Sequence, residues 1–110
     1  MAKKSPSNRM YDTEAGLLKA VKDWLDPQTR DGIAYVRICD MFNKGISDII
    51  ICVRGQFIVV ELKDNTGKPT EHQLKFIERM KKAGAIGGVC RTVKEVADYV
   101  EEAKELTKNR

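Results

Sequence analysis

The apolar residues of the chain follow a helical period in three segments and a strand-like pattern between them. In residues 12–26, DTEAGLLKAVKDWLD, the apolar positions recur every three or four residues, at Leu17, Leu18, Val21, Trp24 and Leu25. Asp12 or Thr13 can cap this segment, and Pro27 follows it. The pattern predicts a first helix over residues 12–26.

Two later segments have the same period. A second helix is predicted over residues 71–83, where one side is apolar, at Leu74, Ile77 and Met80. Thr92 stands three residues before Glu95, the spacing of a capping box, in which a hydroxyl and a carboxylate bind backbone N–H groups at a helix start. This box opens a predicted last helix with one apolar face, formed by Val93, Val96, Ala97, Val100 and Ala103.

Runs rich in β-branched residues separate these helices and predict strands. They are IAYVRIC (33–39), two runs on either side of Arg54-Gly55, and a short run in GAIGGVCR (84–91). Residues 49–51 and 58–60 are apolar at every position, and a strand with two apolar faces is covered on both. The order of elements therefore predicts an α/β fold, with a mixed central sheet flanked by helices.

The composition is that of one globular domain. We expect the domain over residues 12–106, a flexible basic tail at 1–11 and a frayed end at 107–110. No apolar run approaches the roughly 20 residues of a membrane span, and the N-terminus lacks the apolar core of a secretory signal. A cytoplasmic location is expected, the host cytoplasm if a phage encodes the chain. Three scattered cysteines, predicted to be reduced residues of the interior, agree with it: Cys39, Cys52 and Cys90.

The basic residues that give the chain its net charge of +4 are concentrated in the two tails. Five of them lie there, at Lys3, Lys4, Arg9, Lys108 and Arg110. Without these five the body is close to neutral, so charge alone is a weak argument for nucleic-acid binding. Contacts with DNA must then come from local groups, for which we name Lys44, Lys68 and Lys75. Helix-surface lysines are usually just solvated, and that interpretation stays open for each of them.

Charged residues interrupt the apolar stretch SDIIICVRGQFIVVELK, residues 47–63. If a hairpin turns at Arg54-Gly55, Asp48 lies directly opposite Glu61 and projects to the same face of the sheet. Lys63 is two residues beyond Glu61 and shares that face. Opposed carboxylates repel each other by up to about 1 kcal/mol. Either a divalent cation lies between them, or Lys63 bridges both in an ordinary ion-pair cluster.

Two further polar residues are placed toward the same region. Glu14 lies on the apolar stripe of the first helix, although an acid in a first turn also complements the helix dipole. Gln73 stands three residues after Thr70, which predicts a capping box. It also shares a helix face with Ile77 and Met80, so we expect it to point toward the sheet.

The ordered set of these residues resembles the PD-(D/E)xK nuclease superfamily and, within it, the standalone VRR-NUC domains found in phages. The set is Glu14, then Gly45-Ile46-Ser47-Asp48, then Glu61-Leu62-Lys63, then TGKPTEHQ ending in Gln73. The resemblance covers about residues 12 to 100 and includes the order of elements, and it implies a restriction-endonuclease-like core. Ser47 stands where the superfamily name has Pro, at a position that is commonly relaxed.

The resemblance implies a metal site and a role for each residue. Asp48, Glu61 and the Leu62 carbonyl would hold Mg²⁺ or Mn²⁺, and Glu14 would join them directly or through a water molecule. Lys63 would position or activate the attacking water. Gln73 would orient Lys63 or the substrate. No organic cofactor and no membrane partner are expected.

The resemblance also implies a homodimer that cuts branched DNA, because a two-fold dimer presents two sites to a four-way (Holliday) junction. Three alternatives stay open at this point. The chain is a nuclease for flaps, ends or duplex, or a catalytically silent nucleic-acid-binding module on the same fold, or a protein in which the acidic cluster is structural.

Overall fold

A four-stranded mixed sheet forms the centre of the molecule, in a computed structural model that describes residues 5–38 and 49–110. The elements are α1 (Glu14–Leu25), the 3₁₀ helix η1 (Asp26–Asp31), β1 (Ile33–Arg37), β2 (Ile49–Val53), β3 (Gln56–Leu62), α2 (Glu71–Lys82), β4 (Ile86–Cys90) and α3 (Val93–Leu106). The strands lie in the order β1-β2-β3-β4, with β3 and β4 parallel and the other pairs antiparallel. The predicted α/β fold is confirmed.

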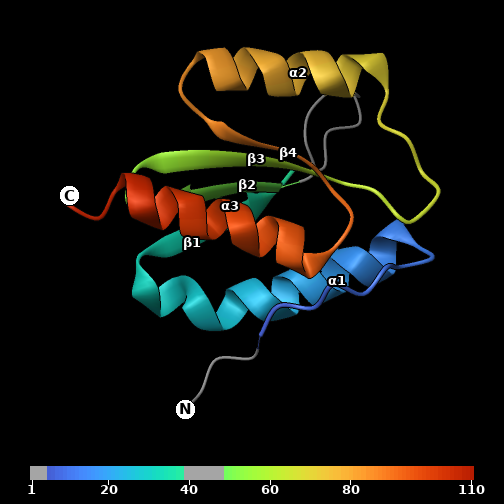
Figure 1. The fold of residues 1–110 in the computed structure, drawn as a ribbon, viewed down its shortest axis with the longest axis horizontal. Helices are drawn as coiled ribbons and strands as arrows, with labels where there is room; N and C mark the ends of the chain where they lie inside the picture. Colours follow the sequence, from blue (N-terminus) through green and yellow to red (C-terminus); the bar gives the residue numbers. More distant parts are fainter. Residues whose placement is uncertain (1–4, 39–48) are drawn as a thin grey trace.

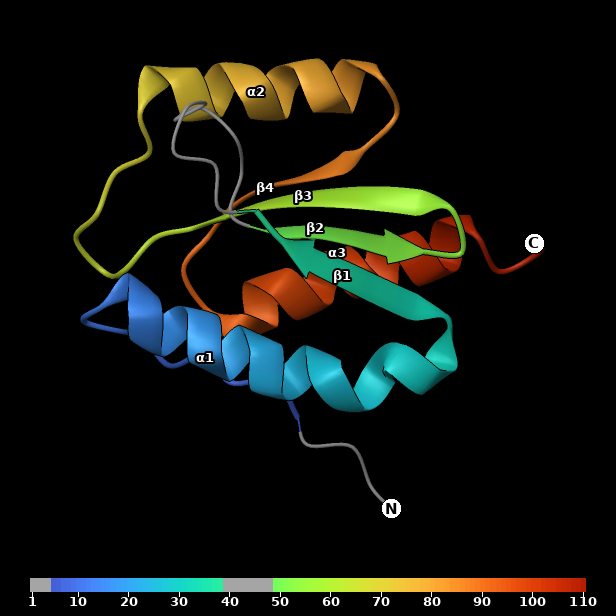
Figure 2. The same cartoon turned by 180° about the vertical axis from the view of Figure 1, so that it is seen from behind.

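Helices cover both faces of this sheet, as Figures 1 and 2 show: α1 and α3 lie on one face and α2 on the other. The α1–α3 face buries the larger apolar cluster, which includes Leu17, Val21, Ile51, Val60 and Val100. Each fully buried side chain of this kind contributes roughly 1.5–3 kcal/mol. The α2 face has a small cluster, formed by Val59, Ile77 and Ala85. Most of the apolar burial that stabilises the fold is thus on the α1–α3 face.

The β2–β3 hairpin has the register that the sequence predicts. Val53 pairs with Gln56, and the pairing continues along the strands to Ile49 and Val60. Arg54 and Gly55 form the two-residue turn with φ values of 50° and 89°. Positive φ at both positions matches the twist of the flanking strands, and glycine adopts it without steric cost. This register puts Glu61 on the α2 face, two residues after Val59.

Close backbone approach explains a glycine in β4. Gly87 pairs with Val59 of β3, and a Cβ atom at Gly87 would lie 2.0 Å from the Val59 carbonyl oxygen. No larger residue fits there without moving one of the two strands.

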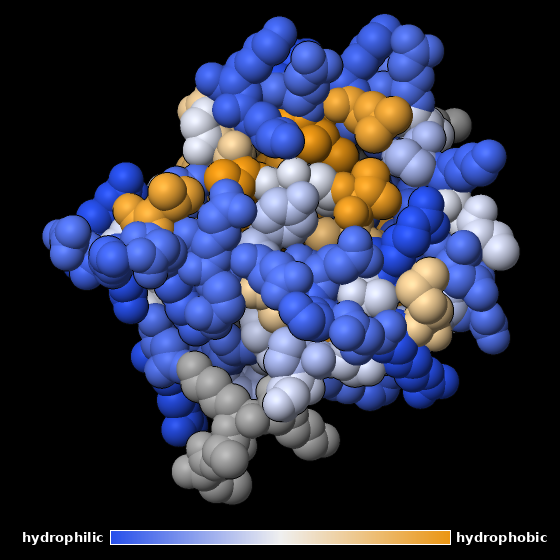
Figure 3. Space-filling model, viewed as in Figure 1, coloured by the Kyte–Doolittle hydropathy of each residue, from blue (hydrophilic) through white to orange (hydrophobic). Residues whose placement is uncertain are grey.

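Beside β4, apolar side chains gather on the surface between α2 and α3 (Figure 3).

Several details differ from the predictions. Leu74 is 47% exposed and turned away from the sheet, because Gln73, Ile77 and Met80 form the inner face of α2. Pro27 lies inside η1, where proline is tolerated in the first turn. The first strand ends at Arg37, and Cys39 lies outside the described residues. Cys90 is buried and Cys52 half-buried, and both are free thiols.

The segments before α1 and after α3 form hydrogen bonds with the rest of the molecule. The Ser7 carbonyl accepts a hydrogen bond from the Lys94 N–H (2.9 Å), and the Tyr11 carbonyl accepts one from the Asn65 N–H (2.8 Å). At the other end, Thr107 is buried, and its hydroxyl donates to the Ala103 carbonyl at 2.7 Å. Among the described residues, no helix is long and apolar enough to cross a membrane.

Candidate active site

Glu61 is a charged side chain placed in the interior, with an exposed fraction of 1%. It is the second-to-last residue of β3, and the sheet register turns it toward the start of α2. Its Oε1 atom accepts a hydrogen bond of 2.7 Å from Nε2 of Gln73. A buried carboxylate is costly unless polar partners offset its desolvation, and the Gln73 amide is one such partner.

Gln73 uses both ends of its amide group. Its Oε1 atom accepts from the Thr70 N–H (2.8 Å), while the Thr70 hydroxyl accepts from the Gln73 N–H (3.2 Å). This is the predicted capping box at the start of α2. The Nε2 group is left to reach Glu61, so the cap holds the amide in the orientation that the contact with Glu61 needs.

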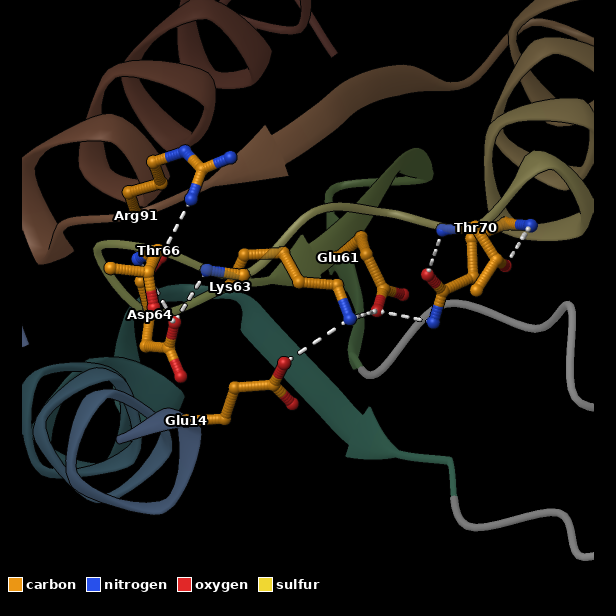
Figure 4. A network of polar contacts seen from close by, with 9 residues as sticks. Glu14, Glu61, Lys63, Asp64, Thr66, Thr70 and Arg91 are labelled. Carbon is orange, nitrogen blue, oxygen red and sulfur yellow. Dashed lines mark hydrogen bonds and ion pairs between the residues drawn. The ribbon is translucent and has the colours of Figure 1, made fainter. Parts of the chain in front are cut away.

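Lys63 joins two carboxylates from different elements, as Figure 4 shows. Its Nζ atom lies 3.1 Å from Oε1 of Glu14 and 3.7 Å from Oε1 of Glu61. The Lys63 side chain is 12% exposed and that of Glu14 is 46% exposed. Glu14, on the first turn of α1, is therefore connected to Glu61 through Lys63, at the edge of the core.

The turn after Lys63 is held by hydrogen bonds at every step. The Asp64 carboxylate accepts from the backbone N–H groups of Gly67 (2.6 Å) and Thr66 (3.1 Å), which lowers the pKa of Asp64 below its ordinary value. Nη1 of Arg91 donates to the Asp64 carbonyl at 2.6 Å. Arg91 was not singled out by sequence reasoning, since a lone arginine after a strand carries no periodic signal.

A groove of about 560 Å³ runs along α1 and reaches the site at Glu14 and Leu62. It is lined by Glu14, Ala15, Leu18, Lys19, Lys22, Asp23, Asp26, Arg37 and Leu62. Lys19 pairs with Asp23 at 2.7 Å. The Tyr35 hydroxyl donates to Asp26, which raises the pKa of Tyr35 to about 12.

Two further basic groups, Lys22 and Arg37, line this groove. Within residues 5–38 and 49–110, Lys22 and Arg37 form no ion pair with a carboxylate. Sequence reasoning did not single out either residue. Only the fold shows that one residue of α1 and the last residue of β1 line the same groove.

Some predicted site residues fall outside the described range or contact other groups. Asp48 and Lys44 lie outside the described residues. Lys68 is exposed in the segment between β3 and α2, and Lys75 pairs with Glu71 at 3.1 Å on the surface of α2. The described part of the chain contains no group of three or more His, Cys, Asp or Glu side chains arranged to hold a metal ion.

The fold is similar to that of solved structures. One, described as a "VRR_NUC domain", has 29% sequence identity and a TM-score of 0.63, with 80% of this chain and 94% of that chain covered. Another, a "VRR_NUC domain protein", has 23% identity and a TM-score of 0.68, with 86% and 89% covered. No family model and no curated protein matches the sequence. The chain therefore has the fold of a VRR-NUC domain, and the resemblance predicted from its sequence is confirmed.

Proposed function

We propose that the chain is a metal-dependent endodeoxyribonuclease of the PD-(D/E)xK type, which hydrolyses phosphodiester bonds in DNA. The observation that carries this proposal is the buried Glu61 carboxylate at the end of β3, held between the Lys63 ammonium and the Gln73 amide. On a VRR-NUC fold, these residues stand in the order that the nuclease resemblance requires.

The donor set suits a hard divalent cation. Carboxylate and carbonyl oxygens are the ligands that Mg²⁺ and Mn²⁺ prefer. Glu61 and the Leu62 carbonyl would hold the ion together with Asp48, and Glu14 would join them directly or through a water molecule. Such an ion lowers the pKa of a bound water and stabilises charge on the scissile phosphate.

Asp48 is included because of the hairpin register. The last pair of the β2–β3 ladder joins Ile49 and Val60, which directly follow Asp48 and directly precede Glu61 in the sequence. Cross-strand neighbours in an antiparallel pair project to the same face. This register supports Asp48 as the partner of Glu61 across the two strands.

Lys63 positions the attacking water and supplies positive charge. Its ammonium lies within 4 Å of two carboxylate oxygens, Oε1 of Glu14 and Oε1 of Glu61. These contacts hold a flexible side chain beside the proposed metal ligands, where a fixed cation would stabilise negative charge that develops on the phosphate. Gln73 fixes the rotamer of Glu61 by occupying one of its oxygens from the α2 side.

DNA would approach along the groove beside α1. Lys22 and Arg37 line it, and it opens on the site at Glu14. Within the described residues neither has an acidic partner, and such cations suit phosphate oxygens, because binding releases condensed counterions rather than breaking an ion pair. Lys68, Lys75 and Lys44 stay candidate contacts for a second strand.

We propose a four-way junction as the substrate and a homodimer as the active form. One chain carries one site, so symmetrical cleavage of a junction needs two chains related by a two-fold axis. The apolar surface between α2 and α3 in Figure 3 supports an interface, since such patches mark association sites.

Cleavage of an end-labelled four-way junction, beside a linear duplex of matched sequence, tests the proposal. The reactions contain Mg²⁺ or Mn²⁺. Paired symmetrical nicks in the junction alone are expected. Equal cutting of both substrates would keep the nuclease and remove the junction preference. No cutting with either metal would contradict the nuclease and favour a binding module.

A further inference from the structure

The turn between Lys63 and α2 is tied to the start of α3, although the two regions are far apart in the sequence. Nη1 of Arg91 donates to the Asp64 carbonyl over a separation of 27 residues. The Arg91 backbone is itself fixed, because its N–H donates to Oε1 of Glu95 at 2.9 Å. The guanidinium therefore extends from a held position onto the residue directly after Lys63.

The same turn lies beside the stem of Lys63. A Cβ atom at Gly67 would lie 3.5 Å from Cδ of Lys63 and 3.0 Å from Oδ1 of Asp64. Gly67 is held there by its N–H, which donates to Oδ1 of Asp64 at 2.6 Å. The stem of Lys63 thus lies beside the backbone of the turn. The Asp64 carboxylate holds this backbone by accepting from its N–H groups, and Arg91 holds it by donating to the Asp64 carbonyl.

We propose that Arg91 is a positioning residue for Lys63, acting through the turn 64–67. The inference rests on the proposed function, because it assigns Arg91 to the reaction that Lys63 serves. Arg91 itself does not line the groove beside α1. Its effect is to keep the Lys63 ammonium between Glu14 and Glu61, since the four-carbon stem of lysine is flexible without such support.

The test compares Arg91→Ala, Arg91→Lys and a matched control, Arg110→Ala. Arg110 also donates from Nη1 to a backbone carbonyl, that of Arg54, at 3.4 Å. Two quantities are measured for each variant. One is the steady-state rate of DNA cleavage, separated into kcat and KM. The other is hydrogen exchange of the Gly67 amide in the metal-free protein, which needs no activity.

We expect Arg91→Ala to lower kcat by about 100-fold, the scale of a misplacement by one ångström, with KM unchanged. Exchange of the Gly67 amide should become faster by roughly tenfold, the scale of one lost hydrogen bond. Arg91→Lys restores a donor and should recover much of kcat and of the protection of the Gly67 amide from exchange. Arg110→Ala should change neither kcat nor this exchange rate.

Three outcomes would overturn the proposal. The first is an unchanged exchange rate of the Gly67 amide in Arg91→Ala. The second is faster exchange of that amide with an unchanged kcat. The third is a raised KM with an unchanged kcat, which would make Arg91 a DNA contact. If the wild-type protein cuts no DNA, the proposed function and the catalytic role of Arg91 fall together. The exchange experiment then still decides whether Arg91 holds the turn, so the two failures are distinguishable.

Discussion

The starts of α2 and α3 are built from the same sequence motif and use it differently. Thr70 and Thr92 both cap their helices by accepting the N–H three residues on, from Gln73 and Glu95. At α2 the returning side chain binds the Thr70 N–H and also Glu61. At α3 the Glu95 carboxylate accepts a hydrogen bond from the Arg91 N–H, one residue before the Thr92 N–H that a capping box would use. The same motif therefore caps both helices, and at α2 it also holds an amide against the buried Glu61 carboxylate.

The largest expected difference in cleavage rate is between substitutions of Glu61 and Glu95, the carboxylates that the starts of α2 and α3 hold. Glu61→Gln should reduce cleavage by about 10²- to 10³-fold, because Glu61 would hold the cation that stabilises transition-state charge. Glu95→Gln should leave the rate unchanged, because glutamine keeps an oxygen that can accept from the Arg91 N–H at the start of α3. Single-turnover cleavage measures both, with circular dichroism to show that each variant is folded. Equal rates for the two variants would remove the distinction.

The next effect separates the two roles of Gln73. Gln73→Glu keeps an oxygen for the Thr70 N–H but loses the N–H group that binds Glu61. Cleavage should fall about 10- to 100-fold, as for other groups that orient a metal ligand. Gln73→Ala should lose a similar factor in rate and also helix stability. Rate and urea unfolding are measured together, and a loss of stability alone would make Gln73 only a cap.

A smaller effect is expected from the caps themselves. Thr70→Ala and Thr92→Ala should each lower the free energy of unfolding by about 1 kcal/mol. Thr92→Ala should not change the cleavage rate, whereas Thr70→Ala should reduce it several-fold, because the Thr70 hydroxyl holds the backbone of Gln73. Denaturant titrations and initial rates provide the comparison. Equal losses of cleavage rate in Thr70→Ala and Thr92→Ala would contradict the expected difference between the two caps.

The smallest effect concerns the turn that links the two regions. Hydrogen bonds from Gly67 and Thr66 lower the pKa of Asp64 below 3.8, its ordinary value. The carboxylate therefore stabilises the folded turn at neutral pH, and this stabilisation is lost as the pH falls through the lowered pKa. The amide shift of Gly67, followed by NMR, should titrate with a midpoint below 3.8. A midpoint at or above that value would contradict the assignment.

Local sequence patterns predict most of this fold. Apolar periodicity locates the helices, and the alternation around Arg54-Gly55 gives the correct register of β2 and β3. That register, together with the spacing from Thr70 to Gln73, is enough to direct Glu61 and Gln73 to one face of the sheet. These features are predictable because each depends on residues close together in the chain.

The remaining features depend on contacts between distant segments. Lys63 and Glu14 are 49 residues apart; the apolar stripe of the first helix directs Glu14 toward the core, but only a family resemblance assigned it to one cluster with Lys63. The roles of Arg91, Lys22 and Arg37 follow from which loops and helix faces meet at the end of the sheet. The inward placement of Leu74 was wrong, since the period of α2 fits two neighbouring faces and packing on β3 and β4 selects the one with Gln73.

Metal binding tests most directly the claim that the polar residues at the sheet end form a metal site. Thermal unfolding would be followed with and without Mn²⁺ for the wild type, Asp48→Ala, Glu61→Gln and Glu95→Gln. Mn²⁺ should stabilise the wild type and Glu95→Gln, by about 2.7 kcal/mol at a hundredfold excess over Kd, and leave Asp48→Ala and Glu61→Gln unchanged. An equal shift in all four proteins would contradict the claim, and Glu61, Lys63 and Gln73 would then be a structural cluster.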